Sequence, residues 1–289
     1  RDPKRAMDKL PAPIRLVTDL SVIRNDEVVD AVIHLAGEPL ADGLWTEKKK
    51  RRVVDSRRGL TQELIGLMAR LGRTPEVFIA ASAVGWYGVS GDEPLTEADS
   101  ACDASFSHES CAAVEETARG AEILGVRVVR LRIGLVLDPA GGLLARMLLP
   151  FEFGLGAPFG DGRQMMSWIT RDDLVRLIVY AVRNPALAGA VNATAPRAAT
   201  NNAFTKSLAR ALGRPALFRI PAGPLRLLLG AFAEELLLGG QNVRPAKALA
   251  AGFVFADADL QTALCEMTGA RARDAVRTAS IGPALAPAE

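Results

Sequence analysis

Apolar residues in this chain follow two alternating patterns. Short, almost wholly apolar runs over residues 28–35, 77–81 and 126–137 read as strands covered on both faces, as in a parallel sheet. Between them, residues 46–70 and 105–124 carry apolar side chains near helical spacing. Weaker signals predict a connector with a short helix over 3–9 and a short strand over 14–18. The alternation predicts an α/β fold with a doubly wound parallel sheet.

Beyond residue 138 this regular alternation is lost. Gly141 and Gly142 precede a predicted helix, and a glycine-rich loop covers 153–162. Thr170 is a predicted N-cap, followed by two acidic residues that complement the helix dipole. A strand over 191–194 and a helix opening at Thr200 and Asn201 come next. The remainder reads as helical with brief strands at 218–220 and 253–255, which predicts a smaller α+β part.

Composition and charge narrow the class of protein. The 289 residues are 49% apolar and 24% charged, as in soluble globular proteins. A net charge of +2 argues against a dedicated nucleic-acid binder, so no nucleic-acid partner is expected. The basic cluster at 48–52 lies within a helical pattern; it is either a solvated face or the source of a phosphate contact. The apolar run 224–240 is too short and too charged to span a bilayer, so no membrane partner is expected.

Cysteine and histidine content excludes two kinds of site. Three cysteines without C-x-x-C spacing indicate a reducing compartment, so we expect a cytoplasmic protein without a disulfide framework. The two histidines, His34 and His108, form no metal-ligand pattern, so no metal is expected.

No predicted strand is followed by a phosphate-binding G-x-G-x-x-G turn, and the glycines at 154–162 lack the required strand–turn–helix context. Ala80 stands where a hydrolase nucleophile elbow needs glycine.

Many ordered motifs together resemble one family. They are WT at 45–46, IHLAGEP at 33–39, DSR at 55–57, SAVGWYG at 82–88, RIGLVL at 132–137, GDGRQ at 160–164, SWI at 167–169, DDL at 172–174, LGGQ at 238–241 and AGF at 251–253. The set resembles the extended, atypical short-chain dehydrogenases/reductases, the NAD(P)-dependent epimerase-like proteins. The resemblance covers nearly the whole chain.

The resemblance implies a Rossmann-type sheet with its own smaller C-terminal domain. We expect a dinucleotide-binding domain over 1–138 plus about 167–196, and a substrate-side domain over 139–166 and 197–289. Family members begin with a strand, a glycine-rich turn and a helix; residues 1–3 resemble the segment just after their second strand, so the sheet is expected to lack its first strand and helix. Related reductases often pair through helices, so a homodimer is expected, although no face of the sequence identifies it.

The implied function is NADP-dependent redox or epimerase chemistry on a small-molecule substrate, with a nucleotide sugar as one candidate. Arg1, at the expected end of the second strand, suits a 2′-phosphate, which favours NADP over NAD. Further cofactor contacts are implied for Leu35, Ala36, Gly37, Arg52, Arg57, Ser82 and Val136. The alternative is a dinucleotide-binding regulatory or scaffold protein that has lost catalysis.

Catalytic residues are harder to assign. Ser82 resembles the reductase serine that hydrogen-bonds a substrate oxygen, but Ala83 occupies the usual register, and a serine capping the strand is the competing interpretation. Tyr87 either contacts substrate or packs in the turn.

The Tyr-x-x-x-Lys pair is missing from the helix that should carry it. One register puts Ser107 and Cys111 at those places, the other Cys111 and Glu115, and neither supplies a phenol held beside an ammonium group. His108 is an acid/base candidate or a surface residue, and Cys111 a nucleophile or a buried structural residue. Arg163 and Gln164 are candidates to face a substrate anion.

Overall fold

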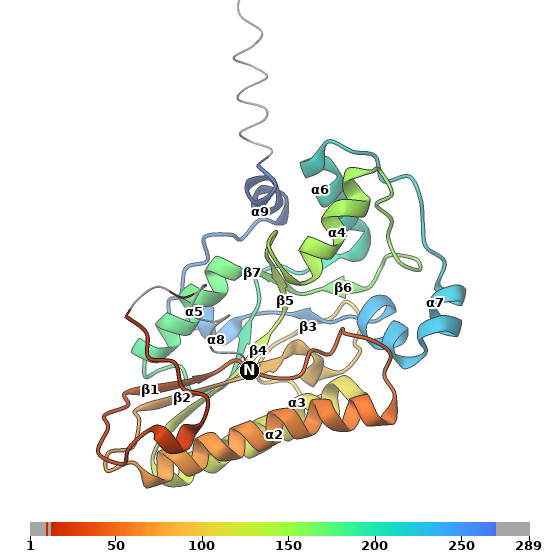
Figure 1. The fold of residues 1–289 in the computed structure, drawn as a ribbon. Helices are drawn as coiled ribbons and strands as arrows, with labels where there is room; N and C mark the ends of the chain where they lie inside the picture. Colours follow the sequence, from red (N-terminus) through yellow and green to blue (C-terminus); the bar gives the residue numbers. More distant parts are fainter. Residues whose placement is uncertain (1–9, 11–12, 270–289) are drawn as a thin grey trace, which may run out of the picture.

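A computed structural model describes residue 10 and residues 13–269, and four parallel strands form its main sheet. These are β1 (Ala31–His34), β2 (Val77–Ala83), β4 (Arg127–Ile133) and β8 (Gly189–Ala193), in the order β1-β2-β4-β8. Val77 pairs with both Ala31 and Arg127, so the carboxyl ends of the strands lie along one edge. The predicted α/β class with a parallel sheet is confirmed (Figure 1).

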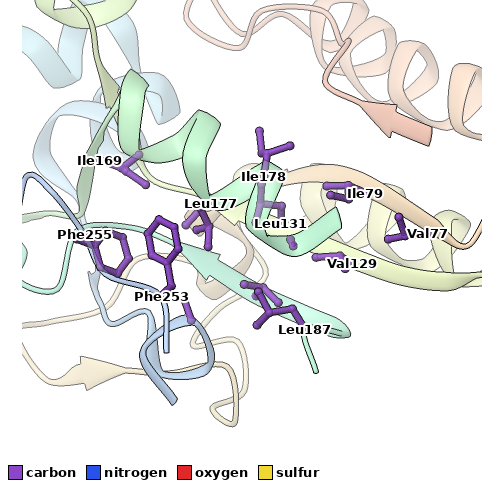
Figure 2. Close-up of a cluster of buried hydrophobic side chains, with 14 residues drawn as sticks. Val77, Ile79, Val129, Leu131, Ile169, Leu177, Ile178, Leu187, Phe253 and Phe255 are labelled. Carbon is purple, nitrogen blue, oxygen red and sulfur yellow. The ribbon is translucent and has the colours of Figure 1, made fainter. Parts of the chain in front are cut away.

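Helices cover both faces of this sheet. Below it in Figure 1, α2 (Glu47–Arg70) and α3 (Phe106–Arg119) lie side by side, the latter continuing into η3 (Gly120–Leu124). Their apolar faces pack on Phe78 and Val128 from the strands. The opposite face packs against α5 (Arg171–Arg183) and α8 (Ala246–Ala250). Figure 2 shows this second cluster, in which Leu177 and Ile178 of α5 meet Leu131 of β4.

The predicted strand over 126–137 is two strands, because the chain changes sheets at Gly134. The N–H of Gly134 still bonds Ala193 O at 3.0 Å, but the N–H of Leu135 bonds Ser167 O at 2.7 Å. From there β5 (Leu135–Leu137) pairs in parallel with β7 (Trp168–Thr170). A Cβ on Gly134 would overlap the Ser167 carbonyl oxygen, so glycine permits the crossing.

A third apolar cluster lies beside this crossing. It joins α4 (Gly142–Glu152), α6 (Asn201–Leu212) and α9 (Leu260–Met267) through Leu144, Phe204 and Leu264 (Figure 1). The strands β6 (Met165–Met166) and β9 (Ala199–Thr200) pair antiparallel beneath it. Thr170 and Thr200 cap α5 and α6 as predicted, their side chains accepting the N–H groups of Asp173 and Ala203.

The C-terminal segment, as far as residue 269, adds no strand to the main sheet. It contains α7 (Ala222–Leu229), a π-helical turn η4 (Ala233–Leu238) and β10 (Asn242–Val243), which pairs in parallel with β3 (Pro94–Leu95). No helix in the described part of the chain is long and apolar enough to cross a membrane.

Five local predictions differ from the structure or lie outside it. The strand predicted over 28–35 is shorter, since β1 is Ala31–His34. No strand forms over 14–18, where the chain is irregular before η1 (Leu20–Val22). The segments 218–220 and 253–255 are not strands either: Ile220 makes one isolated bridge to Phe159, and Phe253 and Phe255 pack in the core as irregular chain (Figure 2). The helix predicted over 3–9 lies outside the described residues.

Candidate substrate pocket at the strand ends

A pocket of about 210 Å³ lies at the carboxyl ends of β2 and β4. Its floor is the end of β2 and the 3-10 turn η2 (Val84–Tyr87), and one wall is the crossing at Gly134. The N-terminal half of α3 forms a second wall, and η4 with the following residues 239–241 closes the pocket from above. This is the place where open α/β sheets bind ligands.

Ala83, and not Ser82, lines this pocket. The Ser82 hydroxyl oxygen is buried below it, next to the Cys111 thiol. The reason is the alternation of the strand, which turns successive side chains to opposite faces. The register noted in the sequence, with Ala83 in the usual place of the reductase serine, is the one that the fold adopts.

Tyr87 also points away from the pocket. Its side chain is fully buried, and its hydroxyl lies 2.9 Å from both Thr96 O and Asn192 Oδ1. Burial raises the pKa of Tyr87, which disfavours the phenolate that a base would need. The packing interpretation of Tyr87 is therefore the one that the geometry supports.

Helix α3 presents Ser107 and Cys111 to the pocket, which decides between the two registers. Glu115, one turn further, is buried against the sheet and forms a fork with Arg132: 2.9 Å from Nε to Oε1 and 3.0 Å from Nη2 to Oε2. The Arg132 guanidinium stacks 3.3 Å from the centre of the Trp86 ring. Glu115 thus fixes the η2 turn to the sheet and does not face a substrate.

Cys111 is a poor nucleophile in this setting. Complete burial raises the pKa of its thiol to about 11, although the Ala83 N–H and the Ser82 hydroxyl favour the thiolate. At neutral pH the group is a protonated thiol in the pocket wall. The prediction of a buried structural cysteine describes it better than that of a nucleophile.

Glu235 is the site residue that the sequence analysis missed. Its carboxylate accepts the Phe106 N–H at 3.1 Å, the Ser107 N–H at 2.9 Å and the Ser107 hydroxyl at 2.6 Å. It lies on the π-helical turn η4, a rare geometry that is frequent at functional sites. The only sequence signal was an acidic residue inside the apolar run 224–240. Ser107 and Glu235 both line the pocket and join its wall to its roof.

The implied cofactor residues follow β1. Leu35 is 56% exposed, and Ala36 is also exposed, so both are accessible at the strand end. A Cβ on Gly37 would meet the Arg57 side chain at 3.2 Å, so glycine lets this arginine lie close to the backbone. Burial lowers the pKa of Arg57, whose guanidinium donates to Val53 O at 3.1 Å.

The other predicted cofactor contacts, at Arg52, Val136 and Arg1, do not gather at the turn after β1. Arg52 lies at the surface, 3.9 Å from Glu38, while the neighbouring Lys49 is buried in a 2.9 Å ion pair with the same carboxylate. Thus one member of the basic cluster is structural. Val136 is half-buried and packs on the core of the main sheet, outside the pocket lining. Arg1 lies outside the described residues.

Of the remaining candidate residues, His108 has a structural position and Gln164 lines the pocket. His108 Nδ1 lies 2.5 Å from Trp86 O, which holds the ring against the η2 turn. Gln164 lines the pocket and donates to Phe159 O and Leu237 O, whereas Arg163 is exposed and does not line it. Within residue 10 and residues 13–269, no group of three or more His, Cys, Asp or Glu side chains could hold a metal ion.

These residues fit a dinucleotide along the strand ends. Small side chains at Ala36 and Gly37 leave the backbone approachable, and Arg57 adds a cation below them. A nicotinamide cofactor bound there would be held by the turn at Ala36 and Gly37 and by Arg57, and it would supply the hydride.

Comparisons with known proteins agree with this geometry. The sequence model of the NAD dependent epimerase/dehydratase family matches residues 17–193, and a domain of unknown function, DUF1731, matches residues 220–267. Epimerase family protein Mb2239 of Mycobacterium bovis is 42% identical over 78% of this chain and 74% of its own length. Epimerase family protein SDR39U1 of Homo sapiens is 32% identical over 90% of this chain and 89% of its own length.

Solved structures give the same result. The crystal structure of human epimerase family protein SDR39U1 (isoform 2) with NADPH matches with a TM-score of 0.81 and 30% identity, covering 90% of this chain and 89% of that one. The nucleoside-diphosphate sugar epimerase from Corynebacterium glutamicum matches with a TM-score of 0.67 and 32% identity, over 83% of this chain and 46% of that one. The expected fold, a Rossmann-type sheet of the short-chain dehydrogenase/reductase kind, is confirmed. This chain belongs to the NAD-dependent epimerase/dehydratase family.

Proposed function

We propose that this protein binds NADPH in preference to NADH and exchanges a hydride between it and a small molecule held in the strand-end pocket. The observation that carries the proposal is the position of that pocket, at the carboxyl ends of β2 and β4 and beneath η4. The NADPH found with the human relative supports the choice of cofactor. Arg57, close to the turn after β1, supports it as a cation for a cofactor phosphate.

Ser107 and Glu235 are the chain's own means of handling the substrate oxygen. When bound, NADPH supplies the hydride. The Ser107 hydroxyl donates to Glu235, so its lone pairs remain free to accept a substrate hydroxyl. In the oxidising direction the substrate proton passes to Ser107 Oγ while the serine proton passes to Glu235; reduction reverses both transfers.

A second candidate function is dinucleotide binding without turnover. Two observations favour it: the Cys111 thiol stays protonated at neutral pH, and Tyr87 is buried away from the pocket. These groups therefore offer no replacement for the Tyr-Lys pair. Only the Ser107–Glu235 pair separates the two functions on structural grounds.

Cofactor titration and a turnover screen test the proposal. NADPH and NADH binding is followed by nicotinamide fluorescence, and NADPH oxidation by absorbance with a panel of aldehydes and ketones. We expect NADPH to bind more tightly than NADH, and Ser107→Ala to abolish turnover while keeping NADPH affinity. Ser100→Ala, at an exposed position, is the control and should behave as the parent protein. Tight NADPH binding without any turnover supports the second function, and failure of both dinucleotides to bind refutes both.

A further inference from the structure

The lining of the pocket indicates which substrates the proposed hydride transfer can use, and the inference rests on that proposed function. Most of its wall is aliphatic or thioether side chain, from Leu40, Leu135, Leu143, Met147, Met166 and Leu237. Among the described residues that line it, none is Arg, Lys or His, and the one charged side chain is Glu235. The space therefore suits apolar surface and repels anions.

The polar groups of the lining are already engaged within the protein. Gln164 donates to Phe159 O at 3.2 Å and to Leu237 O at 2.6 Å. Gln241 donates to Gly88 O at 2.6 Å. Ser167 donates to Gln241 O at 2.6 Å and accepts the Val243 N–H at 2.8 Å. These groups shape the pocket and offer few donors to a ligand with many oxygens.

Ser107 is the polar side chain of the pocket lining that can still form a hydrogen bond with a ligand. Its hydroxyl donates to Glu235 at 2.6 Å and keeps acceptor capacity for an alcohol; because the O–H rotates, it can also donate to a carbonyl oxygen in place of Glu235. The pocket thus has one polar position at the start of α3 and apolar walls around it. A ligand with one oxygen at one end and an apolar body matches this arrangement.

A nucleotide-linked sugar does not match it. Its diphosphate carries negative charge that must be paired when it is removed from water, because an unpaired buried anion costs several kcal/mol. The carboxylate of Glu235 would add repulsion. At about 210 Å³ the pocket is also below the usual range of about 300–1,000 Å³ for ligand sites.

We propose that the substrate is a compact, uncharged aldehyde or ketone with an apolar body, and that nucleotide sugars are excluded. In the reaction the carbonyl carbon gains the hydride of NADPH, and its oxygen takes the Ser107 hydroxyl proton. A proton from solvent then restores the Ser107 hydroxyl by way of Glu235, giving the alcohol and NADP⁺. The oxygen binds beside Ser107, and the apolar body contacts the side chains of α4 and the crossing at Leu135.

A matched pair of ligands tests this directly. The ketone 4-phenylbutan-2-one and the keto acid 2-oxo-4-phenylbutanoate share one skeleton, but a carboxylate replaces the ketone's methyl group. Both are titrated by ligand-observed NMR, with and without NADPH, and UDP-glucose is added as a competitor. We expect the ketone to bind at least about tenfold more tightly than the keto acid, since pocket discrimination by a single misplaced group has this size. UDP-glucose should not displace the ketone.

Pocket-filling variants locate the binding. Ala83→Leu narrows the floor of the pocket and should weaken ketone binding at least about tenfold. If Ala83→Leu does not fold, Met147→Trp, which fills the pocket from α4, is used in its place. The matched control, Ala203→Leu, enlarges an exposed alanine on α6 and should bind as the parent protein does.

The outcomes separate this inference from the proposed function. Equal or tighter binding of the keto acid, displacement by UDP-glucose, failure of the ketone to bind, or unchanged ketone affinity in the folded pocket variants overturns the inference. Ketone binding without oxidation of NADPH contradicts the hydride transfer but leaves the ligand preference of the pocket standing.

Discussion

Replacing Glu235 should loosen the roof of the pocket from α3. In Glu235→Ala the two N–H groups at the start of the helix and the Ser107 hydroxyl lose their shared acceptor. A hydrogen bond to a charged group contributes about 1.5–3 kcal/mol, but Glu235 is only half-buried and water can replace part of its role. Adding the attraction between the carboxylate and the helix N-terminus, we expect a total loss of about 2–3 kcal/mol.

Thermal unfolding measured by circular dichroism checks this value. A loss of that size corresponds to a fall in Tm of about 3–5 °C for a chain of this length. Glu235→Gln keeps an acceptor oxygen without the charge and should fall between the parent protein and Glu235→Ala. Glu234→Ala is the matched control, because its exposed ion pair with Arg226 is worth at most about 1 kcal/mol. If Glu235→Ala melts within the range of Glu234→Ala, the roof is not held by this carboxylate.

Three further predictions concern the surroundings of the pocket. Glu115→Gln leaves the Arg132 cation buried without its counter-ion and should lower the free energy of unfolding, measured in urea, by about 3–5 kcal/mol; an unchanged midpoint would contradict this. At pH 8 a maleimide should label exposed Cys102 and spare Cys111, because burial raises the pKa of Cys111 to about 11; labelling of Cys111 in the folded protein would refute its burial. The stability that the protonated Cys111 thiol contributes should be present below about pH 9 and lost as the pH rises through 11. Gly240→Ala would place a Cβ against the backbone of β6 and should reduce the yield of folded protein strongly, whereas tolerance of alanine there would show that the segment above the pocket can move.

Hydrophobic patterning predicted the elements of the main sheet well. The apolar run 77–81 and the helix over 46–70 correspond closely to β2 and α2, because the strand is apolar on both faces and the helix carries apolar residues at helical spacing. The cap at Thr170 was equally predictable, since its hydroxyl accepts an N–H of its own helix. Interactions between residues close in the sequence were sufficient to predict these elements.

The crossing at Gly134 could not be predicted in the same way. Residues 126–137 are almost uniformly apolar, and the feature that divides them is the capture of the Leu135 N–H by Ser167 O, a partner more than thirty residues away. The segment 253–255 was wrongly predicted as a strand, because its two phenylalanines are buried in the core beside α5 while its backbone joins no strand (Figure 2).

The candidate site was predictable in outline and not in its chemistry. The sequence pointed to the end of β2, and the pocket lies there, but the residue that lines it is Ala83. Ser107 was one of two open registers, which only the packing of Glu115 on Arg132 resolves. Glu235 lies 128 residues from Ser107 along the chain, so no local pattern could connect them.

Isotope transfer is the most direct test of hydride exchange in this pocket. NADPH deuterated at the transferring position of C4 is incubated with the protein and 4-phenylbutan-2-one, and the product is examined by mass spectrometry. The account predicts an alcohol that carries one deuterium on its carbinol carbon, and loss of that product in Ser107→Ala. Absence of the alcohol, or an alcohol without deuterium, would contradict it.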